Sequence, residues 1–482
     1  MTVLQNISLV LTACNLLFAA TIVFLERRHV AATWAWVLVL VFLPGLGFIL
    51  YLLFGQNLRR RRILRIRAAN RTRIGSIVSR QRELFAESRI AFNDPRMEPH
   101  RDFIYMNLSS AHAIYTQDNA VDIFGDGDSK FERLLADIEA VKDHIHLMYY
   151  IVRDDGLGRL LLDKLAEKAA SGVEVRFLAD HIGSHRLPRR FFRPLIEAGG
   201  QAAFFFPIRF GPFSPRINYR NHRKLAVIDG TIGYIGGFNV GDEYRGRHPK
   251  LGFWRDTHLR VEGSAVRQMQ ARFLFDWNLA VPNRPLVTGE RYFPERSGSG
   301  RVGMQIVSSG PDQDQEQIKN GFIKMIHEAE SFIYIQTPYF VPDDSFLTAI
   351  RIAALSGVDV RIMIPARPDY RTVYWATLAH LGDLLQSGVK VYLYRKGFLH
   401  AKTIVVDGKI ATVGTANIDN RSFRLNFEVN AFLFDSETAG RLTALFEEDL
   451  QDAVEMTPGM YQDRPLLHKA RESAARLLSP LL

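Results

Sequence analysis

The feature of this sequence that most constrains its fold is an internal repeat. Residues 221–230 and 399–408 share the pattern His-x-Lys-x4-Asp-Gly, with the histidines at positions 222 and 400. After six intervening residues past each Asp a second match begins, Gly-Gly-Phe-Asn in the first copy and Gly-Thr-Ala-Asn in the second. Repetition of this kind indicates duplication of a whole structural unit, so we expect two related halves.

Each half shows the same alternation of apolar runs and helical segments. The apolar runs, which we expect to be buried strands, are residues 145–152 and 173–178 in the first half and 332–341 and 358–363 in the second. Helical patterns between them end at Gly172 and Gly357, where glycine can serve as a C-cap. This alternation predicts an α/β fold of two pseudo-symmetric domains, residues 118–290 and 302–455, with central, mostly parallel sheets.

Composition limits the classes of protein to consider. Of the 482 residues, 47% are hydrophobic and 23% are charged, which is typical of a globular chain. The net charge of +10 favours anionic partners, which include nucleic acid, acidic lipid and phosphorylated substrates. Cys14 is the only cysteine, so an intrachain disulfide and zinc sites built on several cysteines are excluded.

The first 55 residues are far more apolar than the rest. We predict a membrane hairpin over residues 1–58, with transmembrane helices at about 3–25 and 31–54, because each run is long enough to span a bilayer. A cleaved signal peptide is the alternative for the first run, but residues 1–6 contain no basic side chain. The Leu-Pro-Gly-Leu-Gly sequence at 43–47 is expected to kink the second helix or make it re-entrant.

A basic segment follows the second apolar run. Residues 59–117 form the predicted juxtamembrane connector, and eight arginines lie between positions 59 and 73. Arginines retained beside a membrane segment place that side in the cytoplasm, so we expect a cytoplasmic body on a multi-pass anchor. Contact with anionic headgroups is the favoured use of these arginines, and a nucleic-acid arm is the alternative.

The polar residues of the repeat point to phosphoryl transfer. They are His222, Lys224 and Asn239 in the first half and His400, Lys402 and Asn417 in the second. Lysine and asparagine supply donors and positive charge for phosphate oxygens. One imidazole can attack phosphorus while the other protonates the departing alkoxide. The chemistry needs no metal or cofactor, because the cations belong to the protein.

Four carboxylates accompany this set. Each imidazole needs an acceptor on its other nitrogen, and Asp256 and Glu428, which follow the histidines of their own halves, are the candidates. Asp229 and Asp407 belong to the motif itself. They are either direct participants in the chemistry or turn residues, since Asp-Gly after a strand is a strong hairpin signal.

The doubled motif resembles that of the phospholipase D superfamily, whose signature is two copies of His-x-Lys-x4-Asp-x6-Gly-x-x-Asn. With its two leading apolar segments, and with residues 51–55 and 337–340, the chain is similar to the bacterial cardiolipin synthases of that superfamily. The resemblance implies a phosphatidyltransferase of the bacterial inner membrane that acts on phosphatidylglycerol among anionic lipids. One phosphatidylglycerol would lose glycerol and form a phosphatidyl-histidine, and a second would displace the histidine to give cardiolipin.

The resemblance also implies a role for each matching residue. His222 is the nucleophile and His400 the acid and base; Lys224, Lys402, Asn239 and Asn417 are phosphate ligands; Asp229 and Asp407 are the motif carboxylates; Asp256 and Glu428 orient the histidines. One departure is Gly237, which stands where the superfamily often has Ser or Thr, as Thr415 does in the second half.

Other functions use the same residues differently. A phospholipase would pass the phosphatidyl group to water, and the choice depends on how dry the acceptor site is. A nucleic-acid phosphodiesterase would suit the net charge, although a membrane hairpin favours a lipid substrate and we expect no nucleic-acid partner. A non-catalytic anionic-lipid adaptor has no need of paired His and Lys. The tail at 456–482 is either an amphipathic helix on the membrane or, in the favoured interpretation, packed on the body.

Overall fold

The structure is a computed structural model that describes residues 17, 20, 30–43, 45–47, 50–51, 72–188, 190–207, 218–286, 289–295, 298, 300–313 and 315–480. The chain forms two compact units. The larger unit contains residues 71–205 and 220–482, and all residues predicted for the functional site lie in it. The smaller unit contains residues 1–70 and 206–219.

The two halves of the larger unit share most of their order of elements, which confirms the prediction of two related α/β halves. The first half consists of β1 (Thr116–Phe124), α7 (Gly127–Glu139), β2 (His144–Tyr149), α8 (Gly156–Ala170), β3 (Glu174–Asp180), α9 (Arg193–Glu197), β4 (Gln201–Phe205), β5 (Arg220–Asn221), β6 (Leu225–Ile228), β7 (Ile232–Gly236), η3 (Asp242–Arg245), β8 (Phe253–Arg255), β9 (His258–Glu262), α10 (Ala265–Ala280) and η4 (Glu290–Tyr292). The second half consists of β10 (Val302–Ser309), α11 (Gln317–Glu328), β11 (Phe332–Gln336), β12 (Phe340–Val341), α12 (Asp344–Leu355), β13 (Asp359–Pro365), α13 (Arg371–Leu385), β14 (Lys390–Tyr394), β15 (Gly397–Leu399), β16 (Thr403–Val406), β17 (Ile410–Gly414), β18 (Ile418–Asp419), α14 (Asn420–Arg424), β19 (Asn426–Phe434), α15 (Ser436–Gln451) and β20 (Ala453–Met456).

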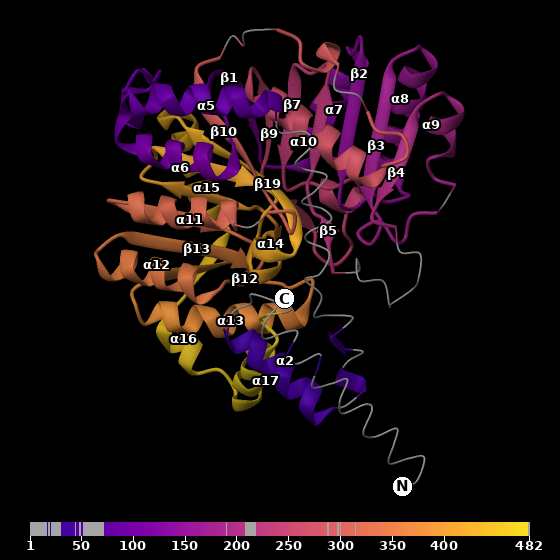
Figure 1. Ribbon diagram of the computed structural model, residues 1–482. Helices are drawn as coiled ribbons and strands as arrows, with labels where there is room; N and C mark the ends of the chain where they lie inside the picture. Colours follow the sequence, from indigo (N-terminus) through magenta and orange to yellow (C-terminus); the bar gives the residue numbers. More distant parts are fainter. Residues whose placement is uncertain are drawn as a thin grey trace, which may run out of the picture. The chain divides into compact units, whose positions relative to one another are not determined.

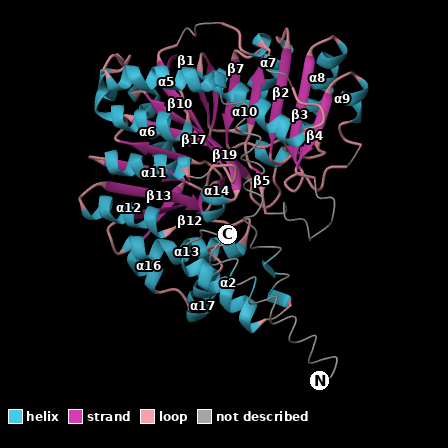
Figure 2. Cartoon of the chain, in the orientation of Figure 1, coloured by secondary structure: helices cyan, strands magenta, loops and turns pink. Residues whose placement is uncertain are grey.

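The strands of both halves join in one continuous sheet. Its order is β20-β14-β13-β11-β16-β17-β19-β10-β1-β9-β7-β6-β2-β3-β4, with β5 paired to β19. The halves meet where β1 pairs antiparallel with β10, with Thr116 opposite Met304. Figure 1 shows α8 and α9 beside β3 and β4 at one end of this sheet and α12 and α13 beside β13 at the other. Figure 2 shows the strands crossing the unit between these helices.

The prediction of mostly parallel sheets is wrong. In the central sheet β2, β3 and β4 of the first half and β11, β13 and β14 of the second are paired in parallel, as is the two-residue β5 with β19. Its other ladders are antiparallel. Helical crossovers connect the parallel strands. The motif strands β6 and β16 instead continue through tight turns at Asp229-Gly230 and Asp407-Gly408, and a tight turn joins only antiparallel strands.

Helices outside the repeat complete the core of the second half. They are α5 (Thr72–Ala86), η1 (Pro95–His100) and α6 (Arg101–Ala111), from the predicted connector. Phe85, Phe103 and Leu108 from these helices are buried in one apolar cluster with Phe322 and Phe432 of the second half. Residues 72–111 therefore belong to the packed body.

The chain ends in two helices, α16 (Pro458–Gln462) and α17 (Leu466–Leu477). Ala475 of α17 is buried in a cluster with Ala376 of α13 and Val341. His380 of α13 lies 3.1 Å from the hydroxyl of Ser479. Leu466 and Leu477 remain 83% and 82% exposed, so α17 is packed on the body along one face and presents leucines on another.

In the smaller unit, α2 (Val30–Phe42) ends one residue before the Leu-Pro-Gly sequence. This is expected, because the residue that precedes a proline disfavours the helical conformation. Gly45 has a positive φ of 83°, and the ring of Tyr51 packs on that of Trp36 at 5.3 Å, so the chain turns back here. The helix predicted over 31–54 is thus broken where a kink or re-entrant turn was predicted. The helix predicted at 3–25 lies outside the described residues apart from Leu17 and Ala20. Among the helices the structure describes, none has the length and apolar character needed to cross a bilayer.

Candidate active site

Two short parallel ladders bring the halves of the site together. Segment β5, directly before His222, pairs with the start of β19 in the other half, and the His222 N–H donates to the Phe427 carbonyl at 3.0 Å. Segment β15, directly before His400, pairs with β8 in the first half, and the His400 N–H donates to the Arg255 carbonyl at 2.6 Å. Each histidine is therefore held beside the residue that precedes the other half's acid.

This exchange pairs each imidazole with a carboxylate from the other half. His222 Nδ1 lies 3.0 Å from both Oε1 and Oε2 of Glu428, and His400 Nδ1 lies 2.5 Å from Oδ2 of Asp256. Both predicted orienting acids thus contact imidazoles, but the expected pairing within each half is wrong. In the sequence each acid follows the histidine of its own half. In the structure the β5–β19 and β15–β8 ladders hold each histidine beside the acid of the other half.

The two lysines lie in the same buried group. Lys224 is fully buried and Lys402 is 3% exposed, and each ammonium donates to the backbone carbonyl of the histidine two residues before it. Burial lowers the pKa of Lys224 to about 7 and that of Lys402 to about 8; each pKa is raised again by Glu428 and Asp256. An anionic phosphate beside them would raise both values, so the group is arranged to receive negative charge.

Burial also shifts the pKa values of the two histidines, His222 and His400, which are 8% and 7% exposed. Burial lowers the pKa of His222, and Glu428 opposes this shift. Burial and then Lys402 lower the pKa of His400 to about 3. Burial alone would raise the pKa of Glu428, but His222 and Lys224 hold it below its usual value, so the carboxylate stays ionised. A neutral imidazole whose Nδ1–H is held by a carboxylate presents the lone pair of Nε2, as a nucleophile requires.

Asp229 and Asp407 are not in this group. Asp229 accepts backbone N–H groups of residues 142, 143 and 144 at 2.8–3.0 Å, and Asp407 accepts those of residues 330, 331 and 332 at 2.7–2.8 Å. Each lies at the far end of a strand, about 16 Å along the chain from its motif lysine. Their placement among the catalytic residues is corrected: they are turn residues, with φ of 52° and 53°, that anchor the starts of β2 and β11.

The motif asparagines are buried and partly bonded. Asn239 accepts the N–H of Ile151 at 3.0 Å and donates to the Tyr244 hydroxyl at 3.2 Å. Asn417 donates to Asp419 at 3.0 Å, while its Oδ1 is buried with no hydrogen-bond partner among the described residues. Each amide nitrogen keeps a second N–H, so both residues can still donate to a ligand.

Sequence reasoning missed several side chains around the histidines. The Tyr150 ring lies 4.8 Å from that of His222, and the Trp254 ring lies 5.2 Å from that of His400. Arg223, the variable residue of the first motif, is fully buried; it pairs with Asp276 at 2.7 Å and donates to the Glu428 carbonyl at 3.0 Å. Its position between the motif His and Lys is the only sequence signal that could have drawn attention to it.

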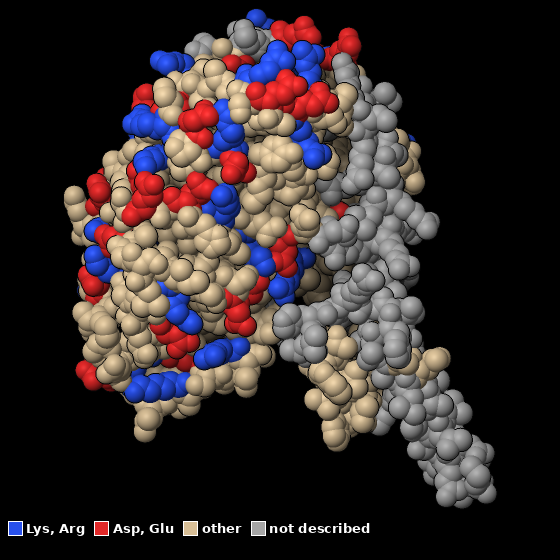
Figure 3. Space-filling model, turned by 60° about the vertical axis from the view of Figure 1, so that its left-hand side comes forward, with Lys and Arg blue, Asp and Glu red and all other residues tan. Residues whose placement is uncertain are grey.

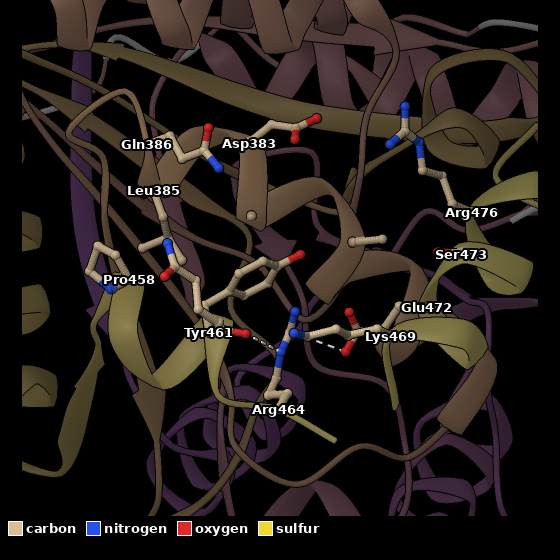
Figure 4. Close-up of a pocket in the computed structure, with 13 residues that line it drawn as sticks. Asp383, Leu385, Gln386, Pro458, Tyr461, Arg464, Lys469, Glu472, Ser473 and Arg476 are labelled. Carbon is tan, nitrogen blue, oxygen red and sulfur yellow. Dashed lines mark hydrogen bonds and ion pairs between the residues drawn. The ribbon is translucent and has the colours of Figure 1, made fainter. Parts of the chain in front are cut away.

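Other surfaces of the described body are less suited to chemistry. On the face shown in Figure 3, Lys and Arg alternate with Asp and Glu, so no extended field of one sign covers it. A cavity of about 260 Å³ lies between α13, α16 and α17, away from the site residues. Figure 4 shows Arg464 there between Tyr461 and Glu472, and the Arg464–Glu472 ion pair measures 2.9 Å. Among the residues described, no cluster of His, Cys, Asp and Glu is arranged to hold a metal ion.

The duplicated α/β halves and the crossed histidine–carboxylate pairs define a phospholipase D-like protein. The chain belongs to the cardiolipin synthase family of such proteins: the family model described as cardiolipin synthase, PLD-like domain, matches residues 134–273 and 322–450. A second model, phospholipase D-nuclease N-terminal, matches residues 13–56. Members of this family are enzymes, phosphatidyltransferases of the phospholipase D superfamily.

The similarity to characterised relatives extends over almost the whole chain. The chain is 54% identical to the major cardiolipin synthase of Bacillus subtilis over 468 residues, 97% of each chain. It is 51% identical to the cardiolipin synthase of Listeria innocua over 482 residues, 100% of each chain. Among solved structures it is similar to the phosphatidylserine synthase of Haemophilus influenzae, with a TM-score of 0.61 and 16% identity, over 79% of this chain and 100% of that one. This last similarity shows the fold alone.

Proposed function

We propose that this enzyme makes cardiolipin by transferring a phosphatidyl group from one phosphatidylglycerol to another, with release of glycerol. The observation that carries the proposal is the pair of buried imidazoles, each held by a carboxylate from the other half and accompanied by a buried lysine. Family membership supports a phospholipid substrate, and the geometry supplies a way to perform the transfer.

In the first step, Nε2 of His222 attacks the phosphorus of phosphatidylglycerol. The bond from phosphorus to the glycerol oxygen breaks. His400, which enters this step as the imidazolium because the bound phosphate anion and Asp256 raise its lowered pKa, gives that oxygen its Nε2 proton. Lys224 and Lys402 stabilise the charge that develops on the non-bridging oxygens, because charge accumulates there in phosphoryl transfer. The product is a phosphatidyl-His222, whose cationic imidazole is stabilised by Glu428.

In the second step, a hydroxyl of a second phosphatidylglycerol attacks phosphorus from the side that glycerol left. His400, now neutral, accepts the hydroxyl proton, and the bond from phosphorus to His222 breaks. Cardiolipin is released and both histidines return to their starting protonation. The short hydrogen bond of 2.5 Å between His400 and Asp256 supports the acid and base role, because it stabilises the imidazolium each time one forms.

The burial of the site favours transfer to a lipid over hydrolysis. With histidines at most 8% exposed, bulk water has little access to the intermediate. We propose further that residues 1–58 anchor the body at the cytoplasmic side of the membrane, which brings the site to its lipids. Engineered surface cysteines in Cys14→Ser protein would contradict this orientation if a membrane-impermeant thiol reagent labelled them in intact cells.

The first experiment is to incubate the purified enzyme with phosphatidylglycerol vesicles without divalent metal and to follow the lipid products. We expect cardiolipin and glycerol in equal amounts from the wild type, and neither from His222→Ala or His400→Ala. Arg424→Gln, on the exposed face of α14, serves as the matched control and should retain activity. Phosphatidic acid in place of cardiolipin would identify a hydrolase and contradict the proposal.

A further inference from the structure

Two arginines beside the site have no part in the mechanism above. Arg220 lies in β5, two residues before His222, and Arg421 lies in the short helix α14. Strand β19, which pairs with Arg220 at Asn426, begins just after α14 ends at Arg424. The two guanidinium groups, one from each half, are thus brought to the same side of the site.

Tyr150 connects these arginines to the reacting groups. Its ring lies 4.8 Å from that of His222, and the Lys224 ammonium lies 5.5 Å from its centroid. Burial and Asp180 raise the pKa of Tyr150 to about 12, while Arg220 and Arg421 act to lower it. The charges of both arginines therefore act on Tyr150, whose ring packs on His222.

Arg220 brings to this place a buried donor that has no acceptor in the part of the chain that the structure describes. Nη1 of Arg220 is buried and has no hydrogen-bond partner among the described residues. Burial and then the charge of Arg220 lower the pKa of Arg421, while Tyr150, Asp419 and Asp180 act to raise it, so the two cations repel each other beside buried carboxylates. A buried donor without an acceptor is costly, and a phosphate oxygen would satisfy it while relieving the repulsion.

The equivalent place in the repeat lacks both arginines. By the register of the two motifs, Phe398 corresponds to Arg220 and Glu243 to Arg421. Phe398 packs on Trp254 at 4.8 Å, and Glu243 is paired with Arg153 at 3.1 Å. The extra positive charge is therefore confined to one side of a pseudo-symmetric site, which makes the two sides different for a substrate.

We propose that Arg220 and Arg421 bind a second phosphodiester, that of the acceptor phosphatidylglycerol, while its free hydroxyl reaches the reacting phosphorus. The inference rests on the proposed function, in which the acceptor carries a phosphate that does not react. The three carbons of its glycerol separate that phosphate from the attacking hydroxyl, so a binding site for it must lie close to the reacting group. The same pair would hold the second phosphate of cardiolipin before release.

The test compares two acceptors for one phosphatidyl-enzyme. Vesicles of phosphatidylglycerol are supplied with labelled glycerol, and cardiolipin and labelled phosphatidylglycerol are measured together. In Arg220→Gln and Arg421→Gln we expect cardiolipin formation to fall by about 10- to 100-fold, because a hydrogen-bonded charge is lost, while exchange with glycerol stays within about twofold of the wild type. Arg424→Gln should leave both rates unchanged.

Two results would overturn the inference. Equal loss of both rates would mean that the arginines serve the donor or the fold, and no change in either would mean that they bind no phosphate. A third acceptor, glycerol 3-phosphate, separates phosphate recognition from contact with the lipid surface. The wild type should use it better than glycerol and both variants should lose that preference; a preference kept in the variants would contradict phosphate binding. Absence of cardiolipin from the wild type would instead refute the proposed function.

Discussion

The two halves of the site have the same elements but hold their histidines with different chemistry. Glu428, which orients His222, also accepts the Thr415 hydroxyl at 2.6 Å. At the equivalent place in the first half, Gly237 leaves room for Asp256: a Cβ there would lie 1.9 Å from Oδ1 of that carboxylate. The longer acid has an extra donor, and the shorter acid approaches its histidine more closely. A duplicated motif has thus become two unlike sites, as suits a nucleophile and an acid.

The largest effect should come from replacing either histidine. His222→Ala and His400→Ala should each lower cardiolipin formation by about 10⁴-fold or more, as for residues that act as one unit. A phosphatidyl ester of p-nitrophenol distinguishes them, since that leaving group needs no protonation. We expect a burst of p-nitrophenol from His400→Ala and none from His222→Ala. The opposite result would exchange the two roles.

The second-largest effect should come from replacing the acids of the crossed histidine–carboxylate pairs. Glu428→Gln should slow the p-nitrophenol burst by about 10- to 100-fold, because His222 loses its orienting carboxylate, whereas Asp256→Asn should leave the burst nearly unchanged and slow turnover of natural lipid. Double-mutant cycles, measured on the burst and on turnover, give the coupling energy between each acid and each histidine. Strong coupling of Glu428 to His400, or of Asp256 to His222, would contradict the crossed arrangement.

Replacing the motif aspartates should affect stability rather than chemistry. Asp229→Ala and Asp407→Ala each remove three backbone hydrogen bonds and place alanine at a positive φ, so we expect a loss of about 2–4 kcal/mol in the free energy of unfolding. The turnover number per folded enzyme should stay close to that of the wild type. The measurement is chemical denaturation in detergent beside an assay of the folded fraction. A large loss of turnover in well-folded protein would restore a catalytic role.

The smallest change in stability is expected for the lysines, and it depends on pH. Lys224 has a pKa of about 7 when folded, below its unfolded value of about 10.4, so its buried charge destabilises the fold fully below pH 7 and progressively less as pH rises to about 10.4. Lys224→Met should therefore be inactive but more stable than the wild type, by about 1–3 kcal/mol at pH 7 and less at pH 9. For Lys402, whose pKa is about 8, the gain should be smaller. A gain that grows with pH would contradict the assigned shift.

The sequence was sufficient to predict the repeat, the α/β halves and the residue types of the site, because apolar periodicity and motif spacing are local properties. It could not predict the crossed pairs, because β5 and β15 are too short to be recognised as strands and the paired residues are 206 and 144 positions apart in the sequence. The same limit applies to Arg223, which bonds Asp276 and Glu428 from distant elements. For Asp229 the sequence left two roles open, and the structure shows its carboxylate bound by the backbone N–H groups of residues 142–144, at the start of β2.

The crossed pairs also have a consequence for biosynthesis. Glu428 follows His222 by 206 residues, so a chain growing from the ribosome exposes the first motif long before the acid that orients it. At about 5–20 residues per second this delay is roughly 10–40 s. During that time the first half can reach the membrane and its lipids while His222 still lacks the carboxylate of Glu428. The nascent enzyme therefore cannot form or hydrolyse a phosphatidyl intermediate efficiently until its second half has been translated and folded.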